Sequence, residues 1–124
     1  MHLIIGGAYQ GKLTFAKKEY GFTEEQIFFC TQEGIDFSKP CITHLEEYTY
    51  GCAQRQEDPR QYFEEHREEW KDAVLICRDI SCGVVPLEKQ DRMWRETTGD
   101  LCQYLAGKAE KVSKLFCGLE QRLK

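Results

Sequence analysis

The chain has 124 residues, of which 41% are hydrophobic and 31% are charged, a balance that excludes a disordered or fibrous protein. Its formal net charge is −4, and its most acidic stretch, residues 64–72, is balanced locally by Arg67 and Lys71, so no basic stripe indicates a nucleic-acid partner. No apolar run approaches the ~18 residues of a membrane span, and no basic region precedes the first apolar residues as in a secretory signal. We therefore expect one cytoplasmic domain over residues 1–124, with neither membrane nor nucleic acid as a partner.

The first elements along the chain predict a strand–helix–strand unit. Residues 3–5 form a short apolar run that ends at Gly6 and Gly7, which is typical of a central strand covered on both faces. Residues 11–20 then predict a helix. Residues 27–30 are rich in β-formers and predict a second strand, parallel to the first.

The middle of the chain is less regular. Residues 32–40 are polar and contain Gly and Pro, so we expect a loop there, whereas residues 42–50 are ambiguous between helix and strand. Asp58 as N-cap and Pro59 at the first helical position predict a helix over residues 59–71. Its apolar positions are sparse, which indicates that most of this helix faces water.

The last part of the chain predicts two further strands around a long helix. Residues 73–77 and residues 115–119 are the expected third and fourth strands. The expected helix spans residues 88–108, and its apolar residues share one face: Trp94, Leu101, Cys102 and Leu105. Strands that alternate with helices indicate a three-layer α/β sandwich with a mainly parallel sheet of about four strands.

The seven cysteines are an odd number, and no two of them have C-x-x-C spacing. Free thiols in a reducing compartment are therefore expected. Cys77, Cys102 and Cys117 lie in apolar surroundings in the sequence, where cysteine acts as a small hydrophobic residue. A metal cluster is the less favoured alternative.

A phosphate-binding loop is predicted after the first strand. Residues 6–12 read G-G-A-Y-Q-G-K, which fits G-x-x-x-x-G-K between a strand and a helix. Glycines let backbone N–H groups turn toward phosphate oxygens, the helix N-terminus adds positive charge, and Lys12 would reach the β- and γ-phosphates; the alternative is a glycine-rich turn with a solvated lysine. The loop makes the expected fold P-loop NTPase-like. The expected nucleotide-binding residues are Gly6, Gly7, Ala8, Tyr9, Gln10, Gly11, Lys12, Leu13 and Thr14.

Coordination of Mg²⁺ departs from the usual pattern of such loops. The expected Ser or Thr after the lysine is replaced by Leu13, and the hydroxyl follows one residue later at Thr14. One helical step of about 100° would aim Thr14 elsewhere. Asp79 follows the third strand, where open α/β sheets place ligands, and we expect it to ligate Mg²⁺ or to act as a base. Lys12 and Asp79 are thus the candidate catalytic residues, with the alternative that Asp79 only caps a turn.

Three segments together resemble one known family. The loop IIGGAYQGKL is similar to that family's strand followed by G-G-x-x-S-G-K-S, and residues 78–86, RDISCGVVP, are similar to its N-E-V-G-x-G-I-V-P. The helix that follows matches at Arg92, Trp94, Arg95, Glu96, Gly99, Gln103, Leu105 and Ala106. The chain therefore resembles the bifunctional adenosylcobinamide kinase and adenosylcobinamide-phosphate guanylyltransferases of cobalamin biosynthesis.

This resemblance implies ATP or GTP as a substrate with Mg²⁺, a corrinoid as a further substrate, and assembly into a homo-oligomer. Members of the family carry a histidine in an H-R-x-x-R-P-x-x-W setting that takes the guanylyl group, and neither His44 nor His66 has that setting. We therefore expect the guanylyltransferase step to be lost.

Three functions stay open at this point. The first is a nucleotide-dependent kinase that transfers a phosphoryl group to a hydroxyl, which Lys12 and Asp79 favour. The second is a catalytically inactive paralogue that binds a nucleotide or an anion, which Leu13 favours. The third is a structural protein that self-associates through its long helix and the edge of its sheet.

Overall fold

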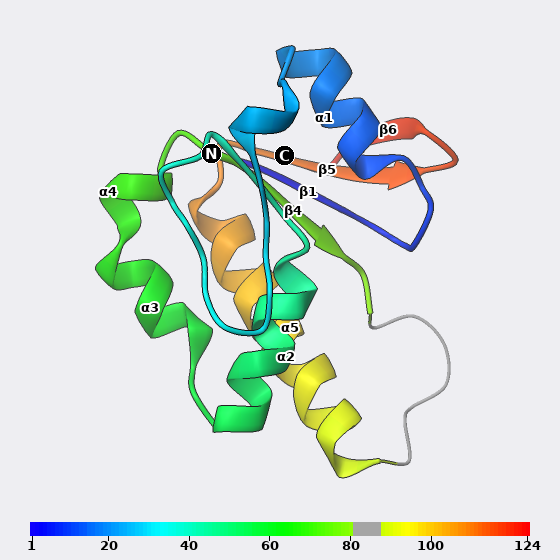
Figure 1. The fold of residues 1–124 in the computed structure, drawn as a ribbon. Coiled ribbons are helices and arrows are strands. Elements are labelled where there is room, and N and C mark those ends of the chain that lie inside the picture. The colour runs from blue at the N-terminus through cyan, green and yellow to red at the C-terminus, as the bar shows by residue number, and fades with distance from the viewer. Residues whose placement is uncertain (81–87) are drawn as a thin grey trace.

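The strands of the protein form one sheet in the computed structural model, which describes residues 1–80 and 88–124 (Figure 1). The strands are β1 (His2–Gly6), β2 (Ile27–Phe29), β3 (Cys41–Thr43), β4 (Val74–Arg78), β5 (Lys111–Phe116) and β6 (Leu119–Arg122). They lie in the order β2-β3-β4-β1-β5-β6, and every pairing is parallel except that of β6 with β5. The expected mainly parallel sheet is confirmed, with six strands among the described residues where about four were expected.

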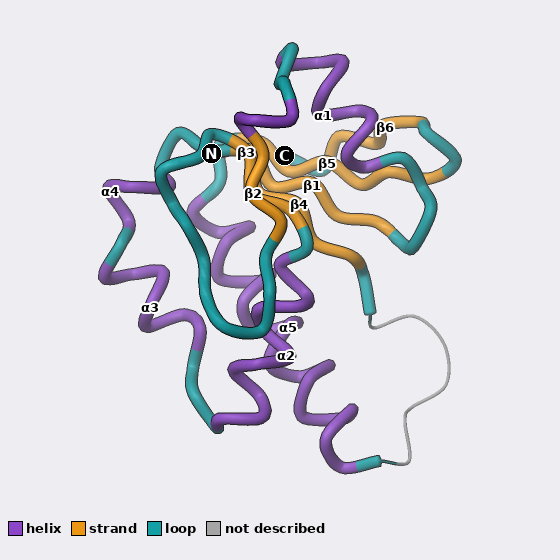
Figure 2. Tube along the Cα trace, in the orientation of Figure 1, coloured by secondary structure: helices purple, strands orange, loops and turns teal. Residues whose placement is uncertain are grey.

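Helices cover both faces of this sheet. The helices are α1 (Lys12–Tyr20), the short 3₁₀ turn η1 (Glu24–Gln26), α2 (Leu45–Arg55), α3 (Pro59–Glu65), α4 (Arg67–Trp70) and α5 (Lys89–Lys108). Figures 1 and 2 show α1 on one side of the strands and α2 and α5 on the other. The three-layer α/β sandwich is thus confirmed. Within the described residues, none of the helices combines the length and the apolar character that crossing a membrane requires.

The core is divided by the sheet into two clusters. Leu3 and Ile4, neighbours in β1, belong to different clusters, because successive side chains of a strand point to opposite faces. Leu3 packs in the cluster that contains Leu101 and Leu105 of α5, whereas Ile4 packs in the cluster that contains Ala16 of α1. The central position expected for the first strand is therefore confirmed.

The first two strands are parallel but not adjacent, because β3 and β4 lie between β2 and β1. The ambiguous segment 42–50 contains both kinds of structure: most of β3, and then the first half of α2. His44 separates them with a φ of 62°. A strand that turns directly into a helix explains why neither periodicity dominates this segment.

The strand expected over residues 115–119 is wrong in its bounds. β5 ends at Phe116, and Cys117 and Gly118 form a two-residue turn with φ values of 52° and 76° before β6 begins. Positive φ at both central positions is the geometry of a tight β-hairpin turn. The segment is therefore a hairpin, and the glycine was the sequence signal for it.

The helix expected over residues 59–71 is divided at His66 into α3 and α4. Asp58 caps it as predicted, since its side chain accepts a hydrogen bond from the backbone N–H of Arg60. Phe63 and Trp70 are fully buried, and the indole N–H of Trp70 donates to the carbonyl of Phe63 at 2.6 Å. Most other side chains of the two helices face water, as expected.

The three cysteines expected to be buried differ in exposure. Cys77 is buried and Cys102 is partly buried, but Cys117 is exposed, so the expectation for Cys117 is wrong. The reason is its place in the hairpin turn, outside both core clusters. Cys82 lies outside the described residues, as do most positions of the motif over residues 78–86.

Candidate nucleotide-binding site

The predicted phosphate loop connects the end of β1 to the start of α1. Gly6 is required there, because a Cβ at this position would lie 2.6 Å from the backbone oxygen of Leu115 on β5. Gly11 has a φ of 87° and precedes α1 without a side chain that could cap it. The backbone N–H groups of the first turn therefore have no side-chain cap from this residue. Gly6 thus lets β1 lie close to β5 where the loop begins, and Gly11 leaves the positive end of α1 available to an anion.

The β5–β6 turn anchors the loop. The side-chain oxygen of Gln10 accepts a hydrogen bond from the backbone N–H of Cys117 at 2.5 Å, and the carbonyl of Gln10 accepts one from the N–H of Gly118 at 2.9 Å. Tyr9 is instead fully exposed, with a φ of 61°. Gln10 therefore positions the loop, whereas the side chain of Tyr9 projects into solvent.

A cavity of about 350 Å³, here called the loop cavity, lies between the loop and the ends of β3 and β4. Its lining residues are Ala8, Tyr9, Gly11, Lys12, Leu13, Thr14, Thr43, His44, Glu46, Ile76 and Arg78. The carboxyl ends of parallel strands meet at one edge of a sheet, where open α/β folds bind ligands. Of the predicted loop residues, six line the cavity, while Gly6, Gly7 and Gln10 shape or anchor its backbone.

Lys12 is held against the loop itself. Its Nζ donates a hydrogen bond to the carbonyl of Gly7 at 2.6 Å. Partial burial lowers the pKa of Lys12, and the negative charge of Glu46 opposes this effect. The lysine is thus a desolvated cation on the wall of the loop cavity, and such a cation gains strongly from an anionic ligand.

Glu46 is a site residue that the sequence interpretation missed. It lies in the first turn of α2, is only 6% exposed and lines the loop cavity. Its Oε1 accepts a hydrogen bond from the backbone N–H of Arg78 at 2.9 Å. An acidic residue just after a buried strand was the available signal, since the ends of β3 and β4 meet at the same edge of the sheet.

Thr14 and Asp79 lie in different places. Thr14 lines the loop cavity together with Leu13. Asp79 follows β4, and its backbone N–H donates to the carbonyl of Gly6 at 2.7 Å. Asp79 lines a separate pocket of about 170 Å³, here called the Asp79 pocket. Arg78 lines both this pocket and the loop cavity.

The two histidines considered for guanylyl transfer also differ in position. His44 is exposed, lines the loop cavity and packs edge-on against Phe29 at 5.4 Å between ring centroids. His66 lies at the junction of α3 and α4, where its ring contacts Tyr62 and its Nδ1 bonds Glu69. Figure 1 shows that junction away from the loop that follows β1.

The chemistry of the loop cavity fits a hard cation such as Mg²⁺. Glu46, Thr14 and Thr43 line it, and their side chains carry oxygen atoms, the ligands that Mg²⁺ prefers. Among residues 1–80 and 88–124, no group of three or more His, Cys, Asp or Glu side chains could hold a metal. A magnesium ion here would depend on phosphate oxygens and water for its remaining ligands, as Mg²⁺ commonly does.

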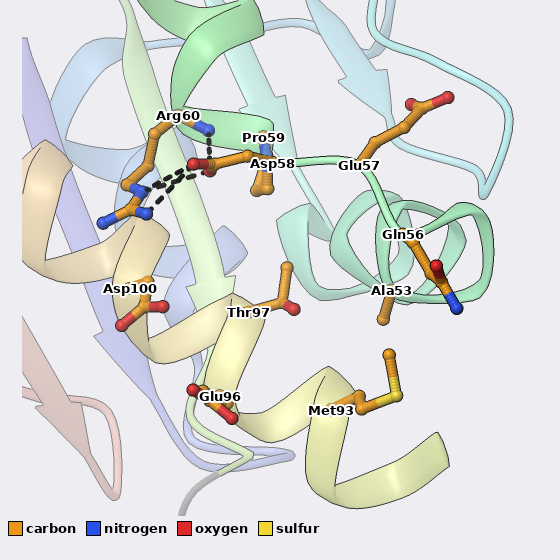
Figure 3. A pocket seen from close by; sticks show the side chains of 10 residues that line it. All are labelled: Ala53, Gln56, Glu57, Asp58, Pro59, Arg60, Met93, Glu96, Thr97 and Asp100. Carbon is orange, nitrogen blue, oxygen red and sulfur yellow. Dashed lines mark hydrogen bonds and ion pairs between the residues drawn. The ribbon is translucent and has the colours of Figure 1, made fainter.

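A third pocket, of about 280 Å³, lies between the α2–α3 connection and α5 (Figure 3). Its acidic lining residues are Glu57, Asp58, Glu96 and Asp100. Its cation, Arg60, donates to both carboxylate oxygens of Asp58 at 3.1 and 3.2 Å. Negative charge around this acidic pocket disfavours a phosphate there.

The order of the sheet, the loop after β1 and the cavity at the carboxyl ends of the strands define an α/β protein of the P-loop NTPase-like class. A family model described as cobinamide kinase / cobinamide phosphate guanyltransferase (CobU) matches residues 40–123. The chain therefore belongs to this family, as its sequence motifs predicted. The match contains Glu46, Arg78 and Asp79 and begins after the phosphate loop. A search of curated proteins found no match.

Proposed function

We propose that the loop cavity binds the phosphates of ATP or GTP and that the protein is a kinase that phosphorylates a hydroxyl group of a corrinoid. The observation that carries this proposal is the convergence of Lys12, the uncapped start of α1 and the carboxylate of Glu46 on one cavity. Membership of a family named for cobinamide kinase supports the reaction and the class of acceptor. Residues 1–124 would act as one nucleotide-binding domain.

Phosphate binding would replace a hydrogen bond that Lys12 makes within the loop. Lys12 donates to the carbonyl of Gly7, and a β- or γ-phosphate oxygen would replace that neutral acceptor with a charged one. The N–H groups at the start of α1 would surround the same phosphates. Bound Mg²⁺ would neutralise phosphate charge, and Glu46 and Thr14 are the residues proposed to hold it. Positioning and charge then supply most of the catalysis.

The transfer step requires a base beside the acceptor. The acceptor oxygen bonds to the γ-phosphorus while the bond from that phosphorus to the bridging oxygen breaks, and the diphosphate leaves with the electron pair. The proton of the acceptor hydroxyl passes to a carboxylate. Asp79 suits this role, because its pocket adjoins the loop cavity through the shared Arg78. Asp79 is therefore proposed as the base rather than the metal ligand.

A second candidate function is nucleotide binding without turnover. Leu13 lines the loop cavity at the position where such loops normally supply the hydroxyl ligand of Mg²⁺. Weak metal binding would then leave an anion- or nucleotide-binding module. In either case we propose that guanylyl transfer is lost, because the chain has no H-R-x-x-R-P-x-x-W segment.

Calorimetric titration with ATP and GTP, with and without Mg²⁺, tests both candidates. We expect a dissociation constant on the order of 10 μM for the wild type and about 100-fold weaker binding for Lys12→Ala, because the variant loses a charged phosphate ligand. Lys18→Ala is the matched control, since Lys18 is an exposed lysine on the same helix. No binding at millimolar nucleotide would contradict both functions.

A phosphorylation assay with cobinamide separates the kinase from the binding module. Phosphorylated product that depends on Lys12 and Asp79 would support the kinase. Tight binding of Mg²⁺-nucleotide with no detectable product or phosphate release would eliminate it and favour the module.

A further inference from the structure

Arg78 is the last residue of β4, and its backbone is held on two sides. It pairs with Gly6 of β1, the first residue of the phosphate loop. Its N–H donates to Oε1 of Glu46 at 2.9 Å. The position of this arginine relative to the loop is therefore set by the sheet and by α2.

The side chain of Arg78 lies at the boundary between two cavities. It lines the loop cavity with Lys12, and it lines the Asp79 pocket with Asp79 and Arg95. Arg78 stands where the similar family motif, N-E-V-G-x-G-I-V-P, has asparagine, so its charge is a feature of this chain.

Trp94 supports the guanidinium from α5. Cζ of Arg78 lies 5.9 Å from the centroid of the Trp94 ring. That ring is itself fixed, because its indole N–H donates to the carbonyl of Glu46 at 2.7 Å and it packs perpendicular to the ring of Tyr50 at a centroid distance of 5.2 Å. Contact with a ring face uses the charge of an arginine but not its in-plane N–H donors, which stay suited to a phosphate.

The charges around the loop cavity favour a ligand with several negative charges. Lys12 and Arg78 contribute two cations, and the positive end of α1 adds to them. One oxygen of the nearby Glu46 carboxylate is occupied by the backbone of Arg78. Burial is the main cause that lowers the pKa of Lys12; the negative charge of Glu46 opposes it, and the positive charge of Arg78 adds a smaller lowering.

We propose that Arg78 binds the terminal phosphate of the nucleotide and remains on the phosphoryl group as it passes to an acceptor in the Asp79 pocket. This inference rests on the proposed function. As the bond between the bridging oxygen and the γ-phosphorus breaks and the acceptor oxygen bonds to that phosphorus, the electron pair stays on the diphosphate. Arg78 offsets negative charge on the three other oxygens of the transferred group. The acceptor proton passes to Asp79.

The test compares ligands that differ only in the terminal phosphate. Calorimetry would measure the affinity of the wild type, Arg78→Gln and Arg78→Lys for ADP and for a non-hydrolysable ATP analogue. The same measurements would be made with GDP and a non-hydrolysable GTP analogue. We expect Arg78→Gln to bind the triphosphate about tenfold more weakly and the diphosphate almost unchanged. Arg78→Lys should be intermediate, because it keeps the charge but not the planar fork. Arg92→Gln is the control, since Arg92 is an exposed arginine of α5.

The possible outcomes separate this inference from the proposed function. If Arg78→Gln lowered the affinity for the diphosphate and for the triphosphate equally, the role of Arg78 would be general or structural and the inference would be overturned. Unchanged affinity for both would overturn it too, while leaving nucleotide binding intact. A wild type that binds neither ligand would overturn the proposed function and this inference together. Thermal melting of each variant without ligand checks that the contact with Trp94 is not the cause of a loss.

Discussion

At the scale of single residues, two buried polar residues outside the candidate nucleotide site, His2 and Ser113, join two exposed ones, Tyr20 and Glu120, in a continuous hydrogen-bonded chain. His2 is 5% exposed, and its Nδ1 and Nε2 lie 2.6 Å from the hydroxyl of Tyr20 and 2.7 Å from that of Ser113. Ser113 donates to Oε2 of Glu120 at 2.5 Å. Ser113 therefore accepts from Nε2–H of His2. Burial lowers the pKa of His2, which favours the neutral imidazole, and Nδ1 of the neutral ring accepts from the hydroxyl of Tyr20.

The chain of hydrogen bonds predicts how stability depends on pH. Burial lowers the pKa of His2 below its usual 6.5, and Glu120 only partly opposes this. Because the folded pKa is the lower one, the stabilisation is complete above pH 6.5 and is lost as the pH falls through the folded pKa. We expect the free energy of unfolding, measured with urea from pH 7.5 to 5, to fall more steeply in the wild type than in His2→Gln. Equal slopes would contradict this prediction.

Residues of the phosphate loop show why a motif is informative only in part. Gly6, Gly11 and Lys12 could be assigned from their spacing, because a tight turn needs glycine and a phosphate needs a cation. Glu46 and Arg78 could not be assigned in this way, because the signal at Glu46, an acidic residue just after a buried strand, does not show which other strands end beside it. They lie beside the loop cavity only because β3, β4 and β1 end at one edge of the sheet.

At the scale of elements, the β5–β6 hairpin links an edge of the sheet to the phosphate loop. Its turn residues, Cys117 and Gly118, donate their N–H groups to Gln10. The turn depends on backbone conformations with positive φ. Stability of the hairpin and position of the loop are therefore coupled.

This coupling predicts the effect of Gly118→Ala. A Cβ at this position meets nothing within 4 Å, but φ is 76°. Alanine therefore causes no clash, and the backbone strain of the left-handed region lowers the free energy of unfolding by about 1 kcal/mol. Urea denaturation measures this loss, and calorimetry should show weaker nucleotide binding. Gly34→Ala is the control, because it also has open space and lacks the positive φ. Equal effects of the two variants would contradict a role for the turn conformation.

At the scale of the whole molecule, the sheet joins the two core clusters, because neighbouring residues of β1 belong to different ones. We predict one cooperative unfolding transition for residues 1–124. Nucleotide at a concentration 100 times its dissociation constant should raise the free energy of unfolding by about 2.7 kcal/mol. The midpoint of thermal unfolding should rise by several degrees. Lys12→Ala should abolish that rise. Two separate melting transitions would contradict a single domain.

By itself, the sequence determined the elements whose signals are local. The strand at residues 3–5, its glycine-rich loop and the helix over residues 88–108 each have a periodicity or a turn signal within a short window, and motifs of this kind were sufficient to predict the family. The tertiary structure decided which elements are neighbours. The insertion of β3 and β4 between β2 and β1 depends on packing between distant segments. The same packing brings Glu46 and Arg78 to the predicted loop, since lateral order in a parallel sheet is set by contacts far apart in the chain.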